Sequence, residues 1–86
     1  MANNDEVIYE GPNKLEVVIM HYENYSSAVV SFKSYNRTIS LEKNELLEVA
    51  NHLENNSDSG LTKLIVPRDE ISEFSQALRK AAEIIE

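Results

Sequence analysis

An internal sequence repeat limits how this chain can fold. Ile39-Ser40-Leu41 leads into an amphipathic segment, and Leu64-Ile65-Val66, which starts 25 residues after Ile39, leads into another. At this offset, residues of the first segment align with residues of similar character in the second: Glu45 with Glu70, Leu46 with Ile71, Glu48 with Glu73, Val49 with Phe74 and Leu53 with Leu78. The pattern predicts two strand-then-helix units that lie side by side.

Upstream of this repeat, the sequence favours strands. Val7-Ile8-Tyr9 is typical of a short edge strand that ends at the turn cluster Gly11-Pro12-Asn13. Further strands are expected at 14–22, 27–35 and 38–41, because β-branched residues such as Val17 and Val18 pack well on a pleated surface. We expect these strands to form an antiparallel meander, with residues 1–6 as a polar, poorly ordered start.

Both amphipathic segments have the spacing of helices that bury one face. The first, over 44–53, repeats apolar residues at i, i+3, i+4 and i+7, and the second continues to the last residues of the chain. Pro67 suits a first turn, because its missing N–H would have no partner there. The predicted core stripes are Leu46, Val49, Ala50 and Leu53, and then Ile71, Phe74, Leu78, Ala81 or Ala82, and Ile85.

Together these elements predict one α+β domain over residues 1–86. Its antiparallel or mixed sheet has four or five strands, two helices pack on one face, and the order is β-β-β-β-α-β-α. The last strand can pair beside 38–41 or at the opposite edge, and a right-handed crossover favours a parallel neighbour. Since a chain of 86 residues buries a modest core, homo-oligomerisation is a further expectation.

Charge divides unevenly along the chain, whose formal net charge is -7. Residues 42–86 hold ten Asp and Glu against five Lys and Arg, whereas residues 14–41 carry a balance of +1. The helices are therefore expected to be acidic, and the sheet close to neutral.

Strand alternation predicts a second apolar sheet face, opposite to the helices. With Val17 and Ile19 turned to the core, the other side of the sheet carries Val18, Met20, Tyr22, Val29, Ser31, Lys33 and Tyr35. An apolar patch with a polar rim usually marks an interaction site. This face is predicted to be either a homodimer interface or a ligand surface.

The residues needed for catalysis or metal binding are scarce. The chain has no cysteine, and its two glycines lie too far apart for a phosphate-binding loop. His21 is expected near the core, as a hydrogen-bonded structural residue rather than a general base. His52 shares a helix face with Glu45 and Glu48, but no third metal ligand is apparent. We expect a non-enzymatic protein without a metal or cofactor.

The first functional hypothesis is an acidic, protein-binding regulator or inhibitor. Immunity factors, antirepressors and phage-type antagonists are of this class, and some mimic nucleic acid by placing acids where phosphates bind. Electrostatic complementarity would speed association with a basic partner and select it. The predicted contact residues on the two helices are Glu42, Glu45, Glu48, Asp69, Glu70 and Glu73.

The alternative is a single-stranded nucleic-acid binder that uses the sheet face. Tyrosines would stack on bases while Lys33 and Arg37 contact phosphates; the predicted residues are Val18, Met20, Tyr22, Lys33, Tyr35 and Arg37. Three strands leading through 37–41 into the helix at 44–53 resemble in outline the modules of the PC4 and PurA-like single-strand binders. Those modules use a basic sheet face, and a net charge of -7 disfavours phosphate binding.

Neither a membrane anchor nor a signal peptide is predicted. The first six residues carry two acids and no apolar run, and the longest apolar stretch, Val17 to Met20, is too short to cross a bilayer. We therefore expect a cytoplasmic location and no membrane partner.

Overall fold

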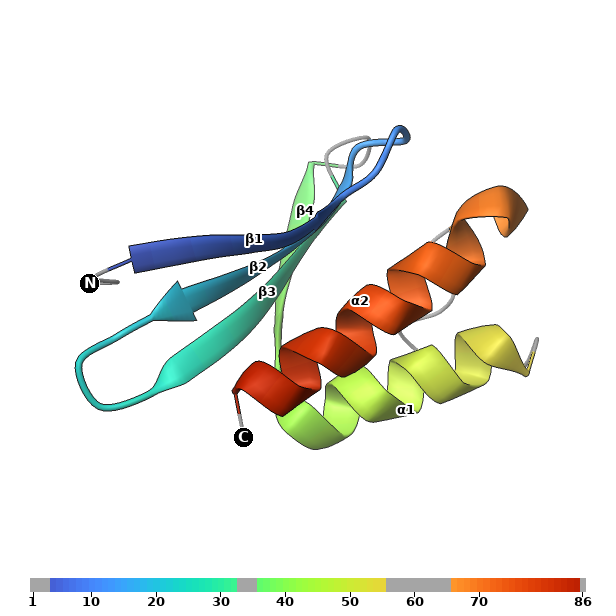
Figure 1. Ribbon diagram of the computed structural model, residues 1–86. Coiled ribbons are helices and arrows are strands. Elements are labelled where there is room, and N and C mark those ends of the chain that lie inside the picture. The colour runs from blue at the N-terminus through green and yellow to red at the C-terminus, as the bar shows by residue number, and fades with distance from the viewer. Residues whose placement is uncertain (1–3, 33–35, 56–65, 86) are drawn as a thin grey trace.

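A computed structural model describes residues 4–32, 36–55 and 66–85 of the chain. Four strands come first, β1 (Asn4–Glu10), β2 (Leu15–His21), β3 (Ser26–Phe32) and β4 (Arg37–Leu41). Two helices follow, α1 (Lys43–Glu54) and α2 (Ile71–Ile84), the second entered through a 3₁₀ turn at Arg68–Glu70. Figure 1 shows both helices on the same side of the sheet. The predicted α+β class is thus confirmed.

The sheet is a four-stranded meander in the order β1-β2-β3-β4, and every neighbouring pair is antiparallel. β1 is longer than predicted, because it begins at Asn4 and so includes Asn4–Glu6, which the sequence assigned to a poorly ordered start. The predicted strand at 64–66 lies mostly outside the described residues, and Val66 itself is not in a strand.

The core lies between the sheet and the helices, as the two periodicities predict. Leu15, Val17 and Ile19 alternate with half-buried residues along β2, and Ala28, Val30 and Phe32 do the same along β3. Both predicted helix stripes are buried, although Ile71 and Ile85 are only half-buried at the ends of theirs. Phe74 fills the centre: its ring centroid lies 6.4 Å from that of Phe32 and 6.0 Å from that of Tyr9.

A β-bulge in β1 decides which of its side chains face the core. Val7 pairs with Val18, but Tyr9 pairs with Val17, so the register shifts between them. Because Val17 faces the helices and Val18 faces away, Tyr9 lies on the core side while Val7 lies on the opposite side. Ile8 and Tyr9, although consecutive, both pack against the core.

The two helices run in opposite directions, which the internal sequence repeat did not indicate. Figure 1 shows the end of α1 beside the start of α2. α2 lies against β1, β2 and β3 and also packs on α1. Glu54, at the end of α1, is bonded to Arg79 of α2, with Nε 3.1 Å from Oε2. This bond lowers the pKa of the Glu54 carboxyl, but an exposed ion pair adds little to stability.

A buried carboxylate fixes the start of α2 to the β1–β2 hairpin. Glu70 is 2 % exposed, and its two oxygens accept hydrogen bonds from the Tyr9 hydroxyl at 2.8 Å and the Asn13 amide at 2.6 Å. Gly11 leaves the space for it, since a Cβ there would lie 2.1 Å from Glu70 Oε2. The hairpin turn and the first turn of α2 are therefore built around a single side chain.

We predict that Gly11→Ala destabilises the wild-type chain by about 1–3 kcal/mol, the usual cost of overpacking. Gly11 has no positive φ, so alanine fits its backbone and would otherwise stabilise the chain by restricting the unfolded state. In a Glu70→Ala background the same substitution should cost less, because of the two side chains that crowd this Cβ only the Tyr9 hydroxyl, 2.6 Å away, would remain, and it would no longer be tied to Glu70. Urea unfolding of the four chains measures this coupling, and an equal cost in both backgrounds would contradict it.

We also predict that stability falls above about pH 10. Burial and the bond to Glu70 raise the pKa of Tyr9 above its ordinary value of 10.0. A raised pKa in the folded state contributes stability below the unfolded pKa, and this is lost as pH rises because only the unfolded chain releases the proton. The free-energy difference between wild type and Tyr9→Phe should therefore shrink above pH 10. Tyr25→Phe, the same substitution at an exposed position, is the matched control.

Candidate functional site

The acids predicted on α1 lie on its exposed side, and two of them make local contacts. Glu45 Oε1 accepts a hydrogen bond from the Glu42 backbone N–H at 2.9 Å, which caps the helix. Glu48 Oε1 lies 3.7 Å from His52 Nε2. Among the described residues no group of three or more His, Asp or Glu could hold a metal ion.

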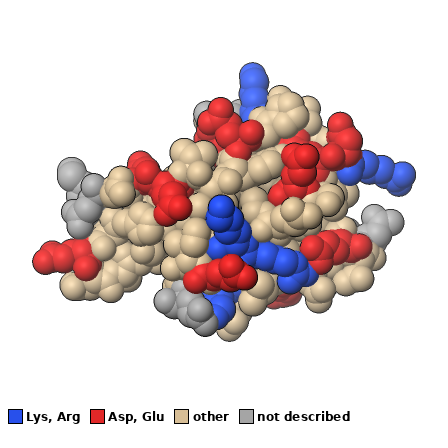
Figure 2. Space-filling model, viewed as in Figure 1, with Lys and Arg blue, Asp and Glu red and all other residues tan. Residues whose placement is uncertain are grey.

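The acids predicted at the start of α2 do not form one surface with those of α1. Asp69 and Glu73 are exposed, but Glu70 is buried beneath the hairpin and cannot contact a partner. Because the helices are antiparallel, the two acidic groups lie at opposite ends of the helix pair. Figure 2 shows Lys and Arg side chains between separate acidic groups. The structure thus brings together only part of the predicted acidic site.

The face of the sheet opposite the helices carries a row of valines. We call it the open face, because no described helix covers it; its apolar residues are Val7, Val18, Met20 and Val29. Val7 pairs with Val18 and Val18 with Val29, so three strands place their side chains in one line. Val7 is 58 % exposed, and the other three are half-buried. Val7 was not predicted here, since only the bulge shows which way it points.

Carboxylates flank this row on both sides. Asp5 pairs with Met20 on one side, and Glu10 pairs with Glu16 on the other. All three lie on the open face, because their partners or neighbours alternate with the buried residues of β2. The described strand residues of the open face include no Lys or Arg. The site is therefore apolar in the centre and acidic at the rim.

Two tyrosines extend the open face at its β2–β3 end. The Tyr22 hydroxyl donates to Met20 Sδ at 3.8 Å, which places Tyr22 beside that residue. The Tyr25 ring stacks on the Tyr22 ring with centroids 4.6 Å apart and planes 13° apart. The backbone N–H of Tyr22 donates to the Tyr25 carbonyl at 2.8 Å, which closes the turn.

The residues predicted to contact phosphates are not brought together on this face. Arg37 pairs with Phe32, a core residue, so it lies on the helix side of the sheet, where it is exposed. Lys33 and Tyr35 lie outside the described residues. The described part of the open face thus presents acids where a nucleic-acid binder needs cations.

His21 joins a chain of hydrogen-bonded side chains across three strands. Its Nδ1 lies 2.9 Å from Ser26 Oγ, and its Nε2 lies 3.0 Å from Glu6 Oε1. The sequence predicted a hydrogen-bonded histidine near the core, and the side chain is half-buried on the core side of β2. Ser26 and Glu6 were not predicted, because cross-strand pairing brings them in. A Ser–His–Glu chain resembles a catalytic triad, but hydrolysis also needs a donor site for the oxyanion.

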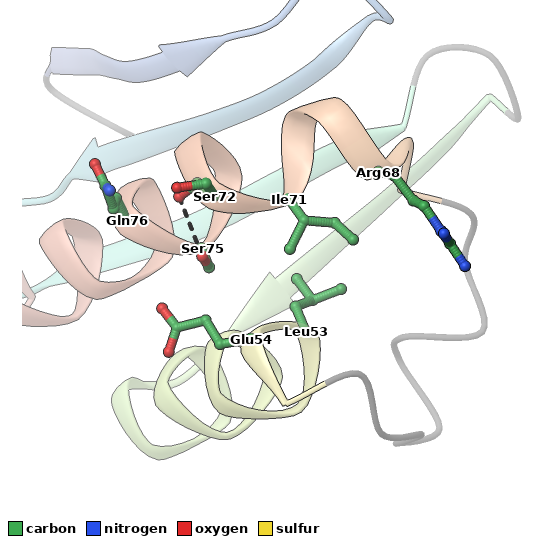
Figure 3. A pocket seen from close by; sticks show the side chains of 7 residues that line it. All are labelled: Leu53, Glu54, Arg68, Ile71, Ser72, Ser75 and Gln76. Carbon is green, nitrogen blue, oxygen red and sulfur yellow. Dashed lines mark hydrogen bonds between the residues drawn. The ribbon is translucent and has the colours of Figure 1, made fainter.

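Two hollows lie at opposite ends of the helix pair. One is an open groove of about 510 Å³ between the end of α1 and the start of α2. Figure 3 shows Leu53 and Ile71 facing each other across it. Its Glu54 is bonded to Arg79, and its buried Ser75 donates to the Ser72 carbonyl, so these polar groups are already satisfied. The other hollow, of about 360 Å³, is lined by Tyr25, three serines, Glu42 and Lys43.

Comparison of the chain with protein-family models, curated proteins and solved structures finds no match. Within the ranges that the structure describes, neither helix is long and apolar enough to cross a membrane.

Proposed function

We propose that this chain is a non-catalytic binding protein that holds a basic protein partner on the open face. The observation that carries the proposal is the row of Val7, Val18 and Val29 between carboxylates on the side of the sheet away from the helices. Interfaces commonly have such an apolar centre and polar rim. The partner would bring apolar side chains to the valines and Lys or Arg to the rim.

The rim charges favour a different protein over a second copy of this chain. A symmetric dimer through the open face would set two copies of one rim against each other, and the charged residues that the described strands contribute to this rim, Asp5, Glu10 and Glu16, are all acidic. Like charges in contact across an interface cost several kcal/mol. A basic partner would instead gain from each of these contacts.

The net charge of -7 supports the same partner chemistry at long range. The exposed acids Glu45, Glu48, Asp69 and Glu73 add to the negative field, although they lie on the other side of the molecule. Such a field attracts a basic protein and speeds its association, and salt screens it. The helix acids therefore contribute to encounter, while the open face contributes the contacts.

We predict that Val18→Lys weakens partner binding by about tenfold or more, as expected for a central interface residue. Peptides are first selected on the wild-type chain from a random display library. The affinities of the enriched sequences are then measured by titration calorimetry at low and physiological salt. Enriched sequences should combine apolar residues with Lys or Arg, and their binding should weaken with salt.

Thr38→Lys is the matched control, since it adds the same charge to the same face at an exposed rim position. It should weaken binding by no more than about threefold, because exposed charges interact weakly. Circular dichroism checks that both variants fold. The proposal fails if Val18→Lys and Thr38→Lys behave alike, or if only Glu45→Lys with Glu48→Lys abolishes binding. Self-association lost on Val18→Lys would assign the face to a dimer instead.

A further inference from the structure

The tyrosine pair at the end of the open face is an aromatic surface fixed before any partner binds. Tyr25 is 62 % exposed, although its ring stacks on Tyr22. Tyr22 is held in turn by its hydroxyl bond to Met20 and by the backbone bond to Tyr25. An exposed ring held in this way binds a flat group at little further cost in side-chain entropy.

The charges near the pair are suited to a cation. Asp5 lies on the open face opposite Met20, the residue that Tyr22 contacts. Glu23, in the same turn as the two rings, is exposed. On the other side of Tyr25, the hollow of about 360 Å³ is lined by both Glu42 and Lys43, so it favours neither sign. The open face therefore has one carboxylate near the ring pair and the turn has another, and an aromatic ring near carboxylates is the setting in which cation–π contacts form.

We propose that Tyr25, backed by Tyr22, is the subsite that takes an arginine side chain of the partner. This inference rests on the proposed function, because the arginine belongs to the basic protein on the open face. Arginine suits the site better than lysine, because its planar guanidinium stacks on a ring while its N–H groups reach a carboxylate. A nucleobase could also stack on Tyr25, but its phosphates would then lie near Asp5 and Glu23.

The test uses the full chain with labelled tyrosine rings and valine methyl groups, titrated by nuclear magnetic resonance. The probe is the blocked peptide Gly-Arg-Val-Arg-Gly, compared with versions that carry lysine or citrulline in place of arginine. Citrulline keeps the shape of arginine but not its charge. The arginine peptide should shift the Tyr22 and Tyr25 rings saturably, whereas the core residue Tyr9 serves as an internal reference. The citrulline peptide should bind at least about fivefold more weakly.

Tyr25→Leu should weaken binding of the arginine peptide by about fivefold, while Tyr25→Phe, which keeps the ring, should bind like wild type. Equal binding of the arginine and citrulline peptides would overturn the inference, as would equal binding by Tyr25→Leu and wild type. Shifts of the valine methyl groups without shifts of the tyrosine rings would overturn this subsite and leave the proposed function standing. Stronger ring shifts with a single-stranded oligonucleotide than with the arginine peptide would overturn both.

Discussion

The position of α2 depends on the Glu70 carboxylate beneath the β1–β2 hairpin. Burying a carboxylate costs free energy unless its oxygens are hydrogen-bonded, and here Tyr9 and Asn13 supply the bonds. Tyr9 can reach Glu70 only because the bulge turns it to the core side. The same bulge leaves Val7 on the open face, paired with Val18. One irregularity in β1 thus anchors the second helix and completes the valine row on the other side of the sheet.

The antiparallel helices explain why charge alone does not define a site. Each helix has acids near its start, where they favour the positive end of the helix dipole. Opposite helix directions then place these acids at the two ends of the helix pair. Charges so placed act mainly through the overall field, which steers association without selecting a contact geometry. A surface that selects a partner also needs apolar groups in register, and the open face supplies them in Val7, Val18 and Val29.

The sequence predicted what depends on local periodicity and missed what depends on contacts between distant segments. Period-two alternation identified the core residues of β2 and β3, and the helical period identified both buried stripes. Glu70 was misassigned because an acid in a first helical turn is usually exposed, and nothing near it in sequence indicates Tyr9 or Asn13. The bulge was missed for a similar reason, since no glycine marks it. The internal sequence repeat identifies two similar segments, but a local pattern carries no information on their relative direction.

The acids around the valine row affect which partners could bind the open face with a favourable free energy. Glu10 and Glu16 lie opposite each other across β1 and β2, and like charges in that position repel. Removing water around them would strengthen the repulsion, because the local dielectric constant falls. A partner that covers Val18 would therefore gain by bringing cations close to the acidic rim. Apolar burial and charge neutralisation are thus coupled on this face, which excludes a purely apolar partner more effectively than either feature alone.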